Sequence, residues 1–144
     1  MSELGYLPDV NVLIALSDID HAGHSAAVRW HGTIGTGRFL LCPITEAGFV
    51  RLVANPLVGG ESFGDAILLL RKISALPNVA HLPVAPAWLE LIEPFRFRMQ
   101  GHRQITDAML LGLAIRHDAV LVTLDRRIRE LAGEEFRANV LTLE

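Results

Sequence analysis

The sequence predicts an α/β fold, a three-layer α/β/α sandwich built on a mostly parallel central sheet. Short apolar segments of strand length alternate along the whole chain with longer segments of helical periodicity. The segment 119–124 is apolar at almost every position, which is typical of a parallel strand covered on both faces. No repeat, low-complexity segment or linker divides residues 1–144, so we expect a single domain.

The first half of the chain begins with a strand that ends at an acid. Asp9 follows the apolar run that starts at Leu4, and apolar residues resume directly after it, so a helix is expected to begin at the strand end. Pro43 opens a later helix, which the pair Asn55–Pro56 closes. We expect, in order, a strand over 4–8, helices over 10–16 and 21–34, a strand over 38–42 and a helix over 44–54.

The second half continues the same alternation. Ser62 is suited to cap the helix that follows it, Pro86 stands at the start of another helix, and Pro94 is expected to kink or split that helix. A polar loop over 100–104 precedes the strongest helical pattern in the chain. We expect, in order, a helix over 63–76, a strand over 79–84, helices over 87–99 and 105–117, a strand over 119–124, a helix over 126–131 and a strand over 139–143.

The composition indicates a soluble, cytoplasmic protein. Cys42 is the only cysteine, so no internal disulfide forms, which fits a reducing compartment. The chain starts without a signal-type segment, and its longest apolar run, 108–115, is far shorter than the roughly 18 residues of a membrane span. The formal net charge of -3 does not itself favour nucleic-acid binding, so such binding must depend on local arginine clusters.

Four acids are predicted to meet at one edge of the sheet. Asp9 and Asp125 each follow a strand, and the carboxyl ends of parallel strands open onto the same crevice. Glu46 and Asp107 lie in the first turns of two helices, and helix starts lie at this same edge. Each acid taken alone is also explained as a helix cap or a first-turn residue, so the prediction depends on the four together.

A cluster of four carboxylates indicates a bound cation. Unpaired carboxylates in one pocket repel one another, and no lysine or histidine stands at these positions to balance them. Ligand sets made only of oxygen suit Mg²⁺ or Mn²⁺. These ions commonly support phosphoryl transfer, so the cluster favours chemistry of that class.

Four segments together carry a resemblance to a known family. They are Leu7–Leu16, Pro43–Phe49, Ile105–Ala108 and Leu121–Asp125, and they contain the four acids in order. With His21, His24, Ala27, Trp30 and the turn over 55–59, they resemble the PIN domain and, more narrowly, the VapC toxins of type II toxin–antitoxin systems. The likeness covers nearly the whole chain, although each motif alone is weak.

The resemblance implies a PIN-like fold and an Mg²⁺- or Mn²⁺-dependent endoribonuclease. Such a toxin cleaves tRNA, rRNA or mRNA and so inhibits translation and growth, until a cognate antitoxin inhibits it. The family's catalytic and metal-binding acids map onto Asp9, Glu46, Asp107 and Asp125. Its accessory polar positions map onto Asn11 and Thr123, which would hydrogen-bond the carboxylates or a bound water.

The family also implies a homodimer and an antitoxin segment wrapped in a groove. Apolar residues all round the helix segment 66–70 favour such a partner surface.

Arginines flank two of the acids and predict contacts with RNA phosphates. The candidates are Arg96, Arg98, Arg103, Arg126 and Arg127. A solvated surface explains the same residues, so this alternative remains open. The run Arg126–Ile128 also departs from many relatives, which carry an acidic or small residue and then an aromatic one, and the departure leaves the substrate preference open.

Three other functions remain to be weighed. A receiver-type phosphoacceptor domain also gathers acids at strand ends, but it needs a lysine after a late strand, whereas Lys72 lies within a helix. A phosphatase of the haloacid type would need a second acid where Asn11 stands. The third is a non-catalytic RNA- or protein-binding module. His21 and His24 are expected to be helix-start and surface residues rather than a metal pair.

Overall fold

Five parallel strands form the centre of the molecule in the computed structural model, which describes residues 4–85 and 87–144. The strands are β1 (Gly5–Pro8), β2 (Arg38–Leu41), β3 (Val79–His81), β4 (Val120–Thr123) and β5 (Val140–Thr142). They lie in the order β3-β2-β1-β4-β5, and every neighbouring pair is parallel. The predicted α/β fold is therefore confirmed, and its sheet is wholly parallel.

The middle strand, β1, is the point at which the strand order reverses. The chain moves from β1 to β2 and β3 on one side, and later to β4 and β5 on the other. Tyr6 pairs with Phe39 on β2 and with Val120 on β4. Just past the strand, the N–H of Asp9 donates to the carbonyl of Val122 at 2.9 Å. Asp9 therefore lies at a topological switch point, where open α/β sheets usually bind their ligands.

Alternating side chains of the strands form two hydrophobic cores, one on each face of the sheet. On β2, Phe39 and Leu41 belong to one core and Leu40 to the other. On β4, Val122 and Leu121 divide in the same way. Because successive strand side chains point to opposite faces, a sheet with both faces apolar must be covered by helices on both sides.

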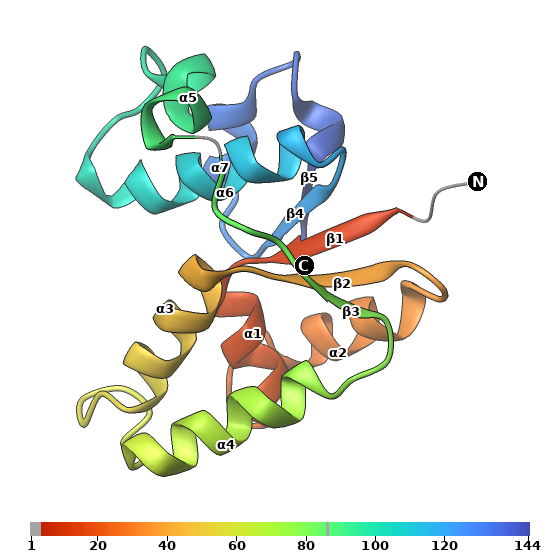
Figure 1. The fold of residues 1–144 in the computed structure, drawn as a ribbon, viewed down its shortest axis with the longest axis vertical. Helices are drawn as coiled ribbons and strands as arrows, with labels where there is room; N and C mark the ends of the chain where they lie inside the picture. The colour runs from red at the N-terminus through yellow and green to blue at the C-terminus, as the bar shows by residue number, and fades with distance from the viewer. Residues whose placement is uncertain (1–3, 86) are drawn as a thin grey trace.

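Helices cover each face of the sheet and complete three layers (Figure 1). The helices α1 (Val10–Ser17), α2 (His24–Thr33), α3 (Pro43–Val53) and α4 (Phe63–Ser74) contribute to the core with Phe39. The helices α5 (Trp88–Ile92), α6 (Ile105–Arg116) and α7 (Arg127–Ala132) contribute to the core with Leu40. Gly112 of α6 lies against the backbone carbonyl of Leu91 in α5, a contact that leaves no room for a Cβ atom.

The helix starts follow from local sequence signals. The hydroxyl of Ser62 accepts the N–H of Asp65 at 3.1 Å, so the predicted cap of α4 is confirmed. Asp9 caps α1 in the same way, because its Oδ1 accepts the N–H of Val12 at 3.0 Å. Pro43 occupies the first turn of α3, where the missing N–H has no partner to lose.

Several predicted boundaries were too long. The helix expected over 87–99 ends at Ile92 and gives way to a 3-10 turn, Glu93–Phe95, centred on Pro94, so the predicted split is confirmed. The strand expected over 79–84 ends at His81, two residues before Pro83, which has no N–H to give the ladder. The predicted role of Pro86 at a helix start lies outside the described residues. The loop over 100–104 contains a 3-10 turn, His102–Gln104, and another, Arg137–Asn139, precedes β5.

The helices were compared in length and hydropathy with a membrane-spanning segment. Among residues 4–85 and 87–144, none is both long enough and apolar enough to cross a bilayer.

Candidate active site

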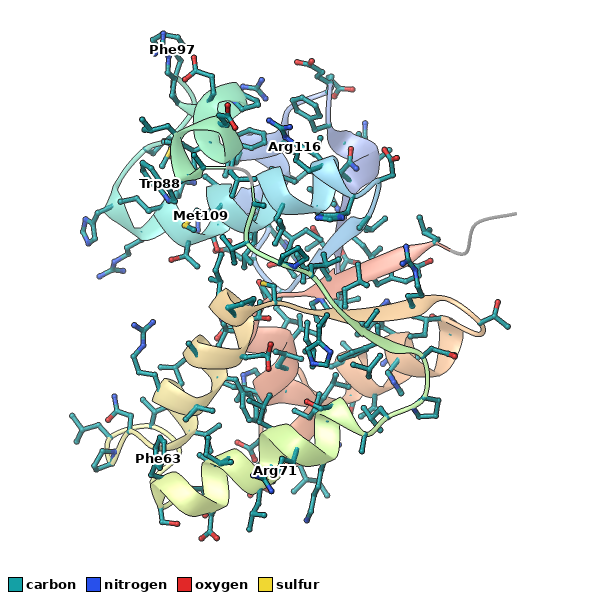
Figure 2. All side chains as sticks on the ribbon, viewed as in Figure 1. Phe63, Arg71, Trp88, Phe97, Met109 and Arg116 are labelled. Atoms are coloured by element: carbon teal, nitrogen blue, oxygen red, sulfur yellow. The ribbon has the colours of Figure 1, made fainter. Side chains whose placement is uncertain are left out.

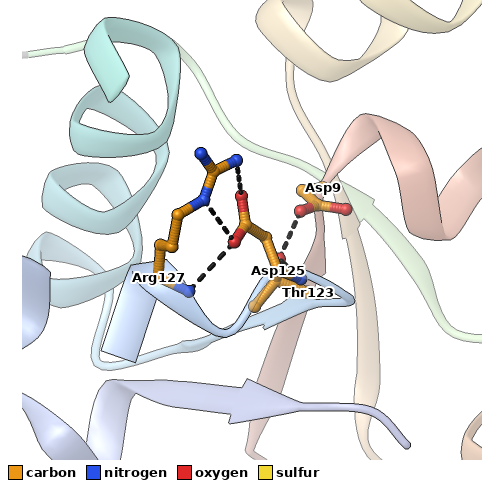
Figure 3. Close-up of polar contacts among 4 residues, drawn as sticks. All are labelled: Asp9, Thr123, Asp125 and Arg127. Atoms are coloured by element: carbon orange, nitrogen blue, oxygen red, sulfur yellow. Dashed lines mark hydrogen bonds and ion pairs between the residues drawn. The ribbon is translucent and has the colours of Figure 1, made fainter. Parts of the chain in front are cut away.

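Asp9 is a buried carboxylate held by hydrogen bonds on both oxygens. Its side chain is 6% exposed. Oδ1 accepts the N–H of Val12, and Oδ2 accepts the hydroxyl of Thr123 at 2.6 Å (Figure 3). Burial raises the pKa of Asp9, and the nearby charge of Asp125 raises it further, while these hydrogen bonds oppose the rise. Asp9 is thus fixed in position, with its negative charge only partly compensated.

Thr123 links Asp9 to the acid that follows β4. Its buried hydroxyl donates to Asp9 and accepts the N–H of Asp125 at 3.0 Å. A single hydroxyl therefore connects the end of β1 to the end of β4. Thr123 therefore hydrogen-bonds a carboxylate, and its role as support for a metal ligand stays a prediction.

Asp125 forms an ion pair with Arg127 (Figure 3). Nε of Arg127 donates to Oδ1 at 3.1 Å, and Nη2 donates to Oδ2 at 2.9 Å. The backbone N–H of Arg127 also donates to Oδ1 at 2.9 Å. These contacts hold the pKa of Asp125 below its usual range. The sequence did not indicate this pair. A basic residue two positions after an acid at a helix start is the signal that would have suggested it.

Asp107 lies in the first turn of α6 and is influenced by the same charges. Burial, followed by the charges of Asp9 and Asp125, raises the pKa of Asp107 to about 6, while Arg127 opposes the rise. Asp107 thus lies within reach of the charges of Asp9 and Asp125, at the edge of the sheet where β1 and β4 end. That these acids form one site stays a prediction.

Glu46 is less closely associated with the other three acids. It lies half-buried in the first turn of α3, directly after β2, and lines a groove between α3 and α4. Among the hydrogen bonds and ion pairs of the described residues, those that hold Asp9 and Asp125 come from Val12, Thr123 and Arg127, and none of them includes the Glu46 side chain. In the same part of the chain, no three acidic, histidine or cysteine side chains are close enough together to hold one metal ion. The arrangement seen here is thus a partly assembled tetrad.

Asn11 influences Asp9 through its backbone rather than its side chain. The N–H of Asn11 helps to lower the pKa of Asp9, and Asn11 is an exposed residue in the first turn of α1. Among the described contacts, none joins that side chain to an acid. The predicted side-chain role of Asn11 therefore stays a prediction.

The donor set fits a hard divalent cation. All donors are carboxylate or hydroxyl oxygens, the ligand type that Mg²⁺ and Mn²⁺ prefer. Burial and mutual repulsion raise the pKa of both Asp9 and Asp107, so negative charge at this edge is not fully balanced by Arg127. A cation would remove that imbalance.

The five candidate arginines have different surroundings. Arg103 and Arg127 line a polar depression of about 340 Å³ with His102, Gln100 and Gln104. Arg126 is exposed, and Arg96 pairs with Glu93 at 3.4 Å. Arg98 donates instead to the carbonyls of Leu131 and Ala132 at 3.1 and 2.7 Å, at the end of α7. The interpretation of Arg98 as an RNA contact is therefore replaced by a structural one.

The two histidines near the start of α2 have structural contacts. Nδ1 of His21 accepts the N–H of Gly23 at 2.9 Å, and Nδ1 of His24 lies 2.7 Å from the carbonyl oxygen of Ala15. His21 thus lies at the turn that leads into α2, and His24 is the first residue of that helix, as the sequence predicted for a helix start. Lys72 lies within α4, as expected, so the lysine of a receiver-type site is not supplied by this residue.

Comparisons with known proteins agree with this geometry. The PIN domain profile matches residues 6–134. Ribonuclease VapC39 of Mycobacterium tuberculosis is 36% identical over 130 residues, covering 88% of this chain and 93% of the relative. Ribonuclease VapC38 of the same organism is 37% identical over 134 residues, covering 93% and 94%.

Solved structures show the same fold at low sequence identity. The crystal structure of VapBC2 from Rickettsia felis, bound to a DNA fragment from its promoter, matches with a TM-score of 0.66 at 12% identity, covering 98% of this chain and 100% of that one. VapC20 of M. tuberculosis, described as a sarcin-ricin loop cleaving toxin, matches with a TM-score of 0.64 at 14% identity, covering 92% and 93%. On the profile match and the sequence identities, the chain belongs to the PIN-domain family and, within it, to the VapC ribonucleases, the toxins of VapBC toxin–antitoxin systems.

Proposed function

We propose that Asp9, Glu46, Asp107 and Asp125 form the catalytic site of this endoribonuclease and hold Mg²⁺ or Mn²⁺. The observation that carries the proposal is the Thr123 hydroxyl, which links the buried carboxylate of Asp9 to the backbone of Asp125 at the carboxyl edge of the sheet. Asp107, in the first turn of α6, lies within reach of both charges. Glu46 extends from the first turn of α3 at the same edge and is proposed as the fourth acid. Ribonucleases of this family generally depend on divalent metal ions, which supports the assignment.

Residues of the chain have separate roles at the proposed site: some orient a carboxylate and others bind the ion. When bound, a divalent ion neutralises the clustered carboxylates and promotes attack of water on a phosphodiester. Thr123 and the N–H of Val12 fix the Asp9 carboxylate, so its orientation does not depend on the ion. Asp107, with a pKa of about 6, is ionised at neutral pH and available as a ligand.

RNA is proposed to reach the acids across the polar depression beside Arg103 and Arg127. Guanidinium groups suit phosphate oxygens, and backbone phosphate contacts supply much of RNA-binding affinity. Arg126 lies exposed beside Arg127, and the exposed Arg96 is a further candidate. A basic rim around an acidic pocket would let phosphates approach while the acids keep their cation.

An antitoxin segment is proposed to occupy the groove between α3 and α4. The groove is lined mainly by apolar side chains, among them Val50, Phe63, Ile67 and Leu70, and it reaches Glu46. Phe63 is 70% exposed at the start of α4, where Figure 2 shows it at the outer end of the helix. The relative from R. felis was crystallised as a VapBC assembly, which supports a partner of this kind.

A homodimer is proposed through exposed apolar side chains of the other layer. Leu89 and Phe97 are 68% and 87% exposed, and Trp88 is also exposed on the α5 side of the molecule (Figure 2). Surfaces of this kind commonly mark protein interfaces. RNA and an antitoxin are both cytoplasmic partners, so we propose that the protein acts in the cytoplasm.

Incubation of purified protein with total RNA, with and without EDTA, tests the proposal. The wild type should produce discrete cut ends that EDTA abolishes. Asp9→Asn, Glu46→Gln, Asp107→Asn and Asp125→Asn should each reduce cleavage at least about a hundredfold. Asp65→Asn is the matched control, because Asp65 is also a first-turn acid, in α4, and is exposed. Cleavage close to wild type by any two of the four variants would remove the tetrad from the mechanism.

A further inference from the structure

The guanidinium of Arg127 is paired with the carboxylate of Asp125, one of the proposed metal ligands. Three donors of this one residue, Nε, Nη2 and the backbone N–H, lie 3.1, 2.9 and 2.9 Å from the two oxygens of Asp125. Both oxygens are engaged, in the fork geometry that makes arginine–carboxylate pairs strong and directional. Asp125 therefore already has a cation as its partner.

This ion pair places a positive charge at the edge of the sheet that carries the proposed metal ligands. A divalent ion placed among these acids would be repelled by a guanidinium in contact with one of them. Arg127 on Asp125 and a divalent ion on Asp125 are thus competing arrangements.

The structure gives the Arg127 side chain another place to lie. It is 66% exposed, and it lines the depression of about 340 Å³ that also contains Arg103 and His102. Ile128, the next residue, is buried in the core and anchors the start of α7. The side chain of Arg127 can therefore leave Asp125 by rotating about its own bonds, without displacement of the helix.

We propose that Arg127 is a built-in counter-ion, which holds Asp125 in the metal-free protein and must be displaced by the divalent cation. The inference rests on the metal site proposed above and concerns how tightly that site takes its ion. Arg127 is a positioning residue in this role, because it acts through Asp125. It lowers the affinity of the site for metal and keeps Asp125 from repelling its neighbours when no metal is bound.

Calorimetric titration of Mn²⁺ into the purified protein at neutral pH tests the inference without an activity readout. Arg127→Ala should bind Mn²⁺ about three- to tenfold more tightly than wild type, as expected for loss of one exposed but bidentate competing pair. Arg127→Lys should be intermediate, because an ammonium keeps the charge but not the two-pronged contact. Arg126→Ala is the control for net charge and should bind like wild type.

Different outcomes separate this inference from the proposed function. Equal or weaker Mn²⁺ binding by Arg127→Ala, with normal binding by wild type, overturns the counter-ion role and leaves the metal site intact. The same gain in Arg126→Ala also overturns it, because the effect would then be one of overall charge. In an Asp125→Asn background, Arg127→Ala should give no gain, and a persisting gain contradicts the competition. If wild type and all variants bind no Mn²⁺, the proposed metal site fails and the inference fails with it.

Discussion

The hydroxyl of Thr123 donates a 2.6 Å hydrogen bond to Oδ2 of Asp9, across 114 positions of the sequence. The hydroxyl oxygen of Thr123 also accepts the N–H of Asp125, so one buried hydroxyl orients two of the proposed metal ligands. Neither strand end can move independently of the other while this contact is kept. Thr123 is therefore the residue through which the geometry of the site depends on the central pair of strands.

Replacement of Thr123 by valine should weaken both stability and activity. Valine keeps the shape but removes the donor, leaving a buried Asp9 oxygen without its partner, at a cost of about 1–3 kcal/mol in the free energy of unfolding. RNA cleavage should fall about 10- to 100-fold, as for loss of other ligand-orienting contacts. Urea unfolding and a cleavage assay measure the two effects. Thr123→Ser, which keeps the hydroxyl, should stay near wild type, and a valine variant that matches wild type in both assays would contradict the linking role.

Asp107→Asn should separate stability from metal binding. The substitution removes a charge that burial and two neighbouring acids disfavour, so the metal-free variant should melt at the same temperature as wild type or higher. Millimolar Mn²⁺ should raise the melting temperature of wild type by mass action, and should raise that of the variant much less. Thermal scans in EDTA and in Mn²⁺ measure both. Asp65→Asn should keep the full metal shift. A less stable Asp107→Asn with an undiminished shift would make Asp107 a helix-start acid only.

The metal-free protein should lose stability as pH rises from about 4 to above 6. Asp107 titrates at 3.8 when unfolded and at about 6 in the fold, and the pKa of Asp9 is raised in the same direction. Between these values the native state binds more protons than the unfolded state, so stability falls with increasing pH. The favourable contribution of Asp107 to the free energy of unfolding is complete below pH 3.8 and is lost as the pH rises through about 6. Asp125, with its lowered pKa, acts oppositely and at lower pH.

Urea unfolding in EDTA at several pH values checks this dependence. The free energy of unfolding of Asp107→Asn should fall less steeply than that of wild type across the same interval. Parallel curves for the two proteins would show that Asp107 is not perturbed by its surroundings.

Two helical glycines should respond to alanine in opposite directions. Gly112 of α6 lies against the Leu91 carbonyl of α5, so a methyl group there forces the helices apart, at a cost of about 1–3 kcal/mol. Gly32 of α2 has no atom within 4 Å of an added Cβ, so Gly32→Ala should stabilise the protein by about 0.5–1 kcal/mol. Denaturant unfolding measures both. A tolerated Gly112→Ala would mean that α5 shifts freely over α6.

Arg103→Ala should weaken RNA binding more than catalysis. Loss of one phosphate contact should raise KM, reduce the salt dependence of binding by about one unit of slope, and leave kcat nearly unchanged. Steady-state cleavage at several salt concentrations measures these effects. Arg29→Ala, an exposed arginine on α2 in the opposite layer, is the control and should change neither. Equal effects of the two variants would indicate a general charge effect.

Sequence patterns predicted the fold and the positions of Asp9 and Asp125 after two strands, because both depend on local signals and topology. The strand before Asp9 and the strand before Asp125 are apolar runs that end at an acid, and parallel strands must deliver such acids to one edge. The shortening of β3 at His81 also has a visible cause in Pro83. These features depend on short segments of sequence and on the backbone, so they do not change when side chains change rotamer.

The sequence did not reveal which partner each side chain selects. The sequence does not suggest that Arg127 pairs with Asp125, and it suggests an RNA contact for Arg98, which instead donates to carbonyls at the end of α7. Both choices are made by rotamers of long side chains among several acceptors within reach. Glu46 shows the same limit, because its position on α3 was predictable and its distance from the other acids was not.

The position of β1 between β2 and β4 sets an order of events while the protein is being made. Asp9 is synthesised first, but Asp107 and Asp125 follow about a hundred residues later, which takes roughly 5–20 s at ordinary rates of translation. Until β4 emerges, β1 has an open edge on that side and Asp9 lacks the Thr123 hydroxyl. A growing chain therefore lacks both the Thr123 contact of Asp9 and the two later acids, so the proposed four-acid site stays incomplete until the last third of the chain has left the ribosome and folded.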